Sequence, residues 1–167
     1  NNVLDVSKLS NGSMALQLAE DDIGSVTQEA AKLVRDDIKK RHHKLTLNLP
    51  EQPLVMPCDR LKLKQILINI LSNAAKFTPD KGQISLTLTV LDDEICFAVQ
   101  DNGVGMSPND IPRALARFSQ LHPSGVKESA GTGLGLPLAK LLVELHGGRL
   151  SIESDLGKGT TVRITLP

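Results

Sequence analysis

The stretch Asn69-Ile70-Leu71-Ser72-Asn73-Ala74-Ala75-Lys76-Phe77-Thr78 decides how this chain of 167 residues is organised. At about 100° per residue, apolar side chains fall on one side of a helix and polar side chains fall on the opposite side. The apolar side comprises Leu63, Ile66, Leu67, Ile70, Leu71 and Ala74, and the polar side comprises Gln65, Asn69, Asn73 and Lys76. The pattern predicts an amphipathic helix that is N-capped by Asp59 and runs to about Phe77, with Pro79 just beyond its end.

The polar face of this helix admits two interpretations. One is the ordinary solvent-facing side of an amphipathic helix. The other is chemical, because the side-chain oxygens of Asn69 and Asn73 suit Mg²⁺, which takes its remaining ligands from water and substrate phosphates. Lys76, one turn further on, suits a phosphate as a point charge. The chemical interpretation predicts a site for a metal-bound triphosphate.

Strand-like and helix-like segments alternate along the rest of the chain. The expected strands are 14–18, 44–49, 54–56, 83–91, 94–100, 149–153 and 161–166, and the other expected helices are 23–41 and 134–145. Residues 107–130 are rich in polar residues, Pro and Gly, which predicts a loop with one helical turn around 111–118. The order of elements predicts a two-layer α/β sandwich, in which three helices pack on one face of a mixed, mostly antiparallel sheet.

Two glycine-rich stretches offer exposed backbone to a ligand. Asp101-x-Gly103-x-Gly105 comes where a predicted strand ends, and an ionised Asp can accept a hydrogen bond from an exocyclic amine such as adenine N6. Its glycines allow the backbone to approach the ring, although the same motif also suits a turn without a ligand. Gly131-x-Gly133-x-Gly135 opens a helix, where free amides form a ready phosphate site. Its spacing is not that of the dinucleotide-binding G-x-G-x-x-G motif.

Composition argues against several other classes of protein. The chain carries 19 basic and 19 acidic residues, no Trp or Tyr and 3 Phe, so it lacks the charge and the stacking platforms of a nucleic-acid-binding protein. Cys58 and Cys96 lack metal-ligand spacing and are expected to be small buried residues in a reducing compartment. No apolar run reaches the roughly 18 residues of a membrane span, so we expect a cytoplasmic domain without direct membrane contact. Because the chain begins at Asn1 without an initiator methionine, we expect a fragment, and a membrane anchor in the parent protein stays open.

Five motifs together resemble the catalytic and ATP-binding domain of a sensor histidine kinase. They are the N box from Gln65 to Thr78, the first glycine box from Asp101 to Gly105, the F box Phe118-Ser119-Gln120, the second glycine box from Gly131 to Gly135, and the closing element Gly157-Lys158-Gly159-Thr160. The resemblance covers about residues 14–167 and implies the Bergerat, or GHKL, fold that gyrase, the large heat-shock chaperone of that superfamily and MutL share. The stretch from Leu136 to Gly148 is similar to kinases of the cell-cycle type related to PleC and DivJ.

This resemblance implies a role for each motif residue. Asn69 and Asn73 would hold Mg²⁺ and Lys76 a phosphate of ATP, so these three form the expected catalytic set. Phe77 would pack near the nucleoside, and Asp101 would bind adenine N6. The remaining nucleotide-binding residues would be Gly103, Gly105, Met106, Gln120, Gly131, Thr132, Gly133, Leu134, Gly135 and Thr160. Residues 107–130 would form a mobile lid over ATP, hinged by Gly125 and Gly131. The chain has Ala116-Arg117-Phe118 where family members often have Glu-Pro-Phe, which leaves the contacts of that lid open.

Residues 1–13 resemble the end of the dimerisation and phosphoacceptor helix that precedes this domain in the family. The acceptor histidine should lie upstream, because none of His42, His43, His122 and His146 has the acceptor context. His42 and His43 follow a basic helix end and are expected to be solvated, and His146, before Gly147-Gly148, is expected to have a local structural role. The resemblance implies three partners: the upstream domain of the same protein, a receiver domain of a response regulator, and a second copy of the parent in a homodimer.

Three functions stay open at this point. The first is transfer of the γ-phosphate of ATP to a histidine on the upstream domain, for relay to a response-regulator Asp. The second is ATP hydrolysis of the gyrase or MutL kind. Those relatives carry a Glu four residues before the metal-binding Asn to activate water, and Asn69 occupies that place here; a carboxamide does not act as a general base. The third is a pseudokinase that binds partners, which the polar residues present in every motif argue against.

Overall fold

A computed structural model describes residues 2–116 and 135–167. In chain order the elements are α1 (Asn2–Ser10), β1 (Ala19–Asp22), α2 (Ile23–Lys40), β2 (Lys44–Asn48), β3 (Val55–Cys58), α3 (Arg60–Phe77), β4 (Gln83–Leu91), β5 (Glu94–Asp101), the 3₁₀ turn η1 (Pro108–Asp110), α4 (Ile111–Ala114), α5 (Gly135–Leu145), β6 (Arg149–Asp155) and β7 (Gly159–Leu166). None of the helices within these ranges combines the length and the apolar composition that crossing a membrane requires.

Five strands form the main sheet, in the order β2-β4-β5-β7-β6. The β2–β4 pair is parallel, and the other three pairs are antiparallel. Along β4 and β5, buried and less buried residues alternate, as expected when only one face of a sheet is covered. Asp92 and Asp93 form the β4–β5 turn with φ of 51° and 64°, the left-handed region that Asp tolerates better than most residues. The predicted mixed sheet and this hairpin are confirmed.

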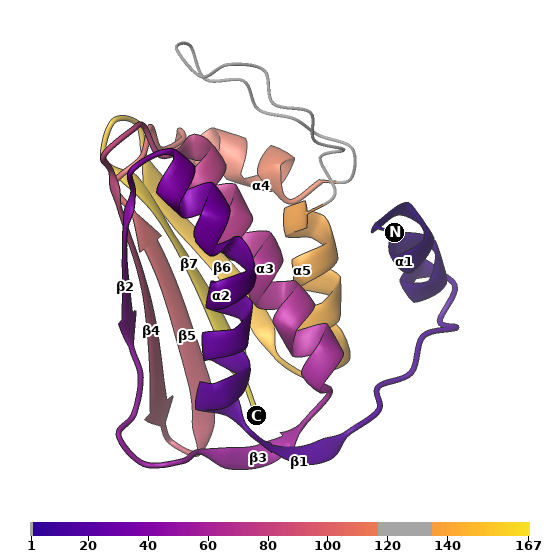
Figure 1. Cartoon of the computed structure of the whole chain (residues 1–167). Helices are drawn as coiled ribbons and strands as arrows, with labels where there is room; N and C mark the ends of the chain where they lie inside the picture. Colours follow the sequence, from indigo (N-terminus) through magenta and orange to yellow (C-terminus); the bar gives the residue numbers. More distant parts are fainter. Residues whose placement is uncertain (1, 117–134) are drawn as a thin grey trace.

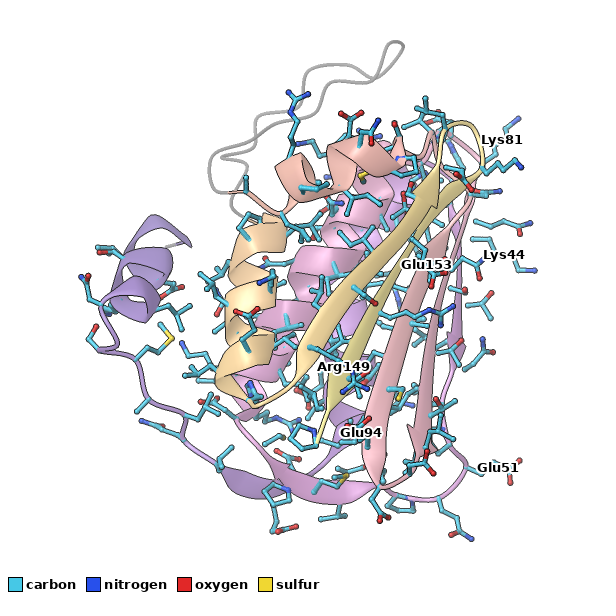
Figure 2. All side chains as sticks on the ribbon, turned by 180° about the vertical axis from the view of Figure 1, so that it is seen from behind. Lys44, Glu51, Lys81, Glu94, Arg149 and Glu153 are labelled. Atoms are coloured by element: carbon cyan, nitrogen blue, oxygen red, sulfur yellow. The ribbon has the colours of Figure 1, made fainter. Side chains whose placement is uncertain are left out.

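Three helices, α2, α3 and α5, cover one face of this sheet (Figure 1), and seen from behind the opposite face carries none of the described helices (Figure 2). The core lies between the two layers. Its largest fully buried side chains are Phe97, Ile23, Leu63, Ile66, Leu67, Ile70, Leu71, Ile84, Leu86, Leu138 and Leu142. On the uncovered face, both guanidinium nitrogens of Arg149 reach the Glu94 carboxylate, at 3.3 and 3.0 Å (Figure 2). The predicted two-layer sandwich with three helices on one face is confirmed.

The predicted N-cap of α3 is also present. The Asp59 carboxylate accepts hydrogen bonds from the backbone N–H of Lys62 at 3.2 Å and from that of Gln17 at 2.9 Å. The first bond satisfies a free amide at the helix start, and the second fixes the chain that leads into β1. Arg60, the next residue, pairs with Asp21 of β1 at 2.6 Å and with Glu29 of α2. The first turn of α3 is therefore joined to both β1 and α2.

The strand predicted at residues 14–18 is wrong. The strand in this region is β1, four residues of sequence Ala-Glu-Asp-Asp, which pairs antiparallel with β3 from Ala19 opposite Cys58 to Asp22 opposite Val55. Residues 11–18 instead form the connection that leads from α1, beside α5, to β1 at the far end of the sandwich (Figure 1). The alternation of apolar residues in 14–18 suggested a strand there. A strand also needs a partner strand in register, and β3 lies beside 19–22.

Candidate functional site

Three segments that are distant in sequence meet at one end of the sandwich. They are the C-terminal end of α3, the turn after β5, and the β6–β7 hairpin, all at the upper end of the molecule in Figure 1. The backbone N–H of Val104 donates to the carbonyl of Phe77 at 3.2 Å, and the carbonyl of Val104 accepts from Gly157 N–H at 2.8 Å. Val104, within the first glycine box, therefore joins the N box on one side to the closing glycine element on the other.

The glycines of the turn are required by close backbone packing. A Cβ on Gly103 would lie 2.5 Å from the Phe77 carbonyl oxygen, and one on Gly105 would lie 2.0 Å from the carbonyl oxygen of Asp155. Gly105 also has φ of +65°, which an L side chain rarely adopts. The sequence suggested that these glycines let the backbone approach a ligand, and the structure adds a reason within the protein itself. They allow the turn to fit between α3 and the β6–β7 hairpin.

Asp101 is the buried acid of this site, with 8% of its surface exposed. Its carboxylate accepts a hydrogen bond from the Gly103 backbone N–H at 2.9 Å. Burial raises the pKa of this carboxyl above its ordinary value, while the hydrogen bonds from the Gly103 and Thr160 backbone and the nearby His43 ring lower it less. The hydrogen bonds that the protein gives to an ionised Asp101 thus do not fully offset the cost of its burial. A hydrogen-bond donor on a ligand would stabilise the ionised form.

This shift has a measurable consequence for stability. Because the folded pKa of Asp101 lies above the unfolded value of about 3.9, its favourable contribution is complete below that pH and is lost as the pH rises through the folded pKa. We expect the free energy of unfolding of the wild type, minus that of Asp101→Asn, to fall as the pH rises from the unfolded pKa of about 3.9 through the folded pKa of Asp101. Urea unfolding of both proteins across this range measures it, and a difference that is constant or rises with pH contradicts the assignment.

The candidate N-box residues Asn69, Asn73 and Lys76 lie in the second half of α3, whose last residue binds this turn. Asn69 has a side-chain nitrogen that is buried and meets no hydrogen-bond partner among the described residues. Lys76 holds its ammonium over the Phe77 ring, 5.2 Å from the ring centre. Within residues 2–116 and 135–167, no three His, Cys, Asp or Glu side chains are grouped so as to hold a metal ion. A metal here would therefore depend on carboxamide oxygens and ligand oxygens. The unpartnered atom of Asn69 is its amide nitrogen, which is a donor, so the side-chain oxygen is the atom of Asn69 that would bind a metal.

Ser154, which belongs to none of the sequence motifs, links two of the remaining site residues. Its Oγ accepts a hydrogen bond from Met106 N–H at 2.8 Å, lies 2.8 Å from Thr160 Oγ1 and donates to the Gly159 carbonyl at 2.9 Å. One side chain of β6 thus holds both Met106 and Thr160, two predicted nucleotide-binding residues. No sequence signal marks Ser154, because it lies in no motif and its partners are far away along the chain.

The second glycine box is described only at its last residue. Gly135 begins α5, and a Cβ placed there would meet no atom of the described residues within 4 Å. The predicted site residues Gln120, Gly131, Thr132, Gly133 and Leu134 lie outside the described residues, as do His122 and most of the predicted lid. The structure brings together Asp101, Gly103, Gly105, Met106, Phe77 and Thr160, and Asn69, Asn73 and Lys76 lie on the turns of α3 that lead to Phe77.

Two expectations about histidines and cysteines need correction. His43 is buried rather than solvated, because its Nε2 lies 2.9 Å from the Thr78 carbonyl and 3.0 Å from that of Pro79. His42 is exposed, as predicted. Cys58 is buried, but Cys96 is only partly so, since it lies on the side of β5 that no helix covers. The local role expected of His146 is confirmed, because its Nδ1 lies 2.8 Å from the Leu142 carbonyl.

Known proteins share both this sequence and this fold. The histidine protein kinase DivJ of Caulobacter vibrioides is 41% identical over 168 residues, covering 100% of this chain and 28% of DivJ. The non-motile and phage-resistance protein of the same organism is 37% identical over 171 residues, covering 100% of this chain and 20% of that protein. Among solved structures, full-length ShkA in complex with AMPPNP superposes with a TM-score of 0.87 at 29% identity, over 100% of this chain and 34% of ShkA.

The chain thus spans less than a third of the length of the two Caulobacter relatives and 34% of that of ShkA. Residues 58–167 match the family described as histidine kinase-, DNA gyrase B-, and HSP90-like ATPase. The matched range begins at the last residue of β3 and includes α3, the glycine turn after β5 and the β6–β7 hairpin, which are the three segments that meet at the site. The sequence, the fold and the arrangement of the site agree, and the chain belongs to the histidine kinase-, DNA gyrase B- and HSP90-like ATPase family.

Proposed function

We propose that this chain is the ATP-binding catalytic domain of a sensor histidine kinase, which donates the γ-phosphate of ATP to a histidine on an upstream helical domain. The observation that carries the proposal is the Asp101 carboxylate, buried at the end of β5 in a turn that packs against the last residue of α3. A buried acceptor with a raised pKa suits an amine donor such as adenine N6. The full-length ShkA structure, similar over the whole chain, holds the ATP analogue AMPPNP.

The phosphates of ATP would lie toward α3 and the start of α5. Lys76 is one turn beyond Asn73 on α3, so one helix presents a cation and two carboxamides to the same ligand. Asn69 and Asn73 would hold Mg²⁺, and when bound that ion would neutralise charge on the phosphates. The backbone from Gly131 to Gly135 would bind the β- and γ-phosphates, and Gln120 and Thr160 would complete the site. In this arrangement the protein contributes mainly orientation and electrostatic stabilisation.

Phosphoryl transfer is favoured over ATP hydrolysis by the residue at position 69. A hydrolase of the gyrase or MutL kind needs a Glu there as general base, and Asn69 offers a carboxamide instead. A pseudokinase role is disfavoured, because Asn73, Lys76 and Asp101 are all present. The sequence similarity to the histidine kinase DivJ supports transfer to histidine.

The proposed partners follow from this role. Residues 1–13, including α1, would be the end of the dimerisation and phosphoacceptor domain, and 14–167 would be the catalytic domain. In the structure Gln65 Nε2 of α3 donates to Asp5 Oδ2 of α1 at 3.1 Å, so the two parts touch. The phosphoryl group would pass from the acceptor histidine to the receiver domain of a response regulator. The parent would act as a homodimer, with this domain in the cytoplasm.

The test is incubation with radiolabelled ATP and Mg²⁺, with and without the upstream helical domain supplied as a separate polypeptide. We expect the chain alone to acquire no label and to turn over little ATP, because none of its histidines has the acceptor context. With the helical domain present, that domain should gain an acid-labile, base-stable phosphoryl group. Rapid ATP turnover by the chain alone, at the 1–10³ s⁻¹ typical of enzymes, would instead favour the hydrolase.

A further inference from the structure

The C-terminal end of α3 is hydrogen-bonded by a segment that no motif includes. A helix leaves its last carbonyl groups without partners inside the helix, and these groups need donors from elsewhere. At this end, five consecutive carbonyls, those of residues 75–79, all accept a hydrogen bond. The glycine turn supplies one donor, through Val104 to Phe77. Side chains from the α2–β2 connection supply donors to the other four.

Arg41, the C-cap of α2, serves the first two of these carbonyls. Its Nη1 donates to the Lys76 carbonyl at 3.0 Å and to the Ala75 carbonyl at 3.4 Å. The guanidinium is partly buried there and places a positive charge at the negative end of the α3 dipole. A lysine at this position would have one flexible ammonium in place of the rigid planar group. Arg41 therefore holds the backbone of the residue that carries the predicted phosphate-binding side chain.

His43 serves the last two of the five carbonyls. Its ring is buried, and Nε2 lies 2.9 Å from the Thr78 carbonyl and 3.0 Å from the Pro79 carbonyl. Two acceptors at one ring nitrogen require that nitrogen to carry the proton. Backbone bonds complete the connection, because Lys81 N–H donates to the Arg41 carbonyl and Lys44 N–H donates to the Gly82 carbonyl, both at 3.0 Å. The α2–β2 and α3–β4 connections are therefore joined along their length.

We propose that Arg41 and His43 are positioning residues for nucleotide binding, which act through the backbone of residues 75–79 to hold Lys76 and Phe77 in place. This inference rests on the proposed function, since it takes Lys76 and Phe77 as nucleotide-binding residues. Neither Arg41 nor His43 touches the ligand in this account. Their contribution is to keep the last turn of α3 from fraying at the place where a small displacement of the ammonium weakens binding.

The first experiment compares Arg41→Met with Arg60→Met. Arg60 is also a partly buried arginine that joins helices, but its partners Asp21 and Glu29 lie at the opposite end of α3. Calorimetric titration with Mg-AMPPNP gives the dissociation constant, and thermal unfolding gives Tm. We expect both variants to lower Tm, but only Arg41→Met to raise the dissociation constant, by roughly three- to tenfold. Equal dissociation constants for wild type and Arg41→Met would overturn the inference.

A double-mutant cycle separates positioning from a general loss of stability. If Arg41 acts through Lys76, Arg41→Met should change the dissociation constant by less than about twofold in a Lys76→Met background. If the fold-change in dissociation constant of the double variant equals the product of those of Arg41→Met and Lys76→Met, the two residues act independently and the inference is contradicted. If Arg41→Met fails to fold, Arg41→Lys provides the same comparison, because its single ammonium poorly replaces the guanidinium. For His43, Gln should retain more affinity than Phe, since only Gln keeps a donor.

Binding by the wild type distinguishes a failure of the proposed function from a failure of the role proposed for Arg41. A wild type that does not bind Mg-AMPPNP contradicts the proposed function itself. A wild type that binds, together with an Arg41→Met variant that binds equally well, contradicts only the role of Arg41 and leaves the proposed function standing.

Discussion

Asn73→Asp is expected to abolish phosphoryl transfer to the upstream helical domain, with a loss of at least roughly a hundredfold. Asn73 lies on α3 one turn before Phe77, whose carbonyl binds the glycine turn. A carboxylate there would add a negative charge beside the triphosphate and change the charge at the metal. The measurement is the rate of label transfer from radiolabelled ATP to the helical domain supplied as a separate polypeptide.

Asn48→Asp is the matched control for this variant. It makes the same chemical change on β2, where the Asn48 amide donates to Thr87 Oγ1 on an exposed part of the sheet at 3.1 Å. We expect it to transfer label at nearly the wild-type rate. Transfer by Asn73→Asp at a rate comparable to that of the control would show that Asn73 does not hold the metal.

Asp101→Asn is expected to weaken binding of adenine nucleotides by about 1–3 kcal/mol, or about 5- to 150-fold. The adenine amine would lose a charged acceptor in a buried site, and the amide would present a donor in one of its orientations. Burial raises the pKa of Asp101, so the wild type loses stability as the pH rises and the variant does not lose it in this way. The free energy of unfolding of the variant, relative to that of the wild type, should therefore increase from acid to neutral pH. Calorimetry with Mg-AMPPNP measures the first effect.

The control for this variant is Asp93→Asn, in the turn at the opposite end of β5. Asp93 has φ of 64°, a conformation that Asn also tolerates, so the change removes one negative charge with little effect on the fold. Its affinity for Mg-AMPPNP should equal that of the wild type. If Asp101→Asn also binds as the wild type does, Asp101 is not the adenine acceptor.

Much of the fold could be predicted from local pattern. In a two-layer sandwich, apolar residues repeat every three to four positions along a helix and every second position along a strand that is covered on one face. Helix α3 has an apolar face at helical spacing and an N-cap at Asp59, and β4 and β5 alternate around a two-residue turn. The strand predicted at 14–18 fails for a non-local reason. Whether an extended segment joins a sheet depends on the strand beside it, and β3 pairs with the acidic residues 19–22.

The site was predictable where its residues lie in motifs and not where they act across the fold. Asp101, Phe77, Met106 and Thr160, which the motifs assign to one nucleotide site, lie in segments that the structure brings together, and their roles in binding stay predictions. Ser154, which joins two of them, resembles any serine on a surface strand. His43 follows a basic helix end, which suggests solvation, and only the α3–β4 connection packed over it buries the ring. The roles of Ser154 and His43 depend on contacts between segments that are far apart in the chain. The spacing of residues in a single sequence does not reveal such contacts.

The most direct test of the central claim is a pair of calorimetric titrations of the wild-type chain, one with Mg-AMPPNP and one with the guanine analogue Mg-GMPPNP. We expect micromolar binding of the adenine analogue, about −8 kcal/mol at roughly 1 μM, because Asp101 would accept from the adenine amine. Guanine carries a carbonyl in place of that amine, so its analogue should bind at least about tenfold more weakly. Absence of binding by Mg-AMPPNP, or equal affinity for the two analogues, would contradict the account.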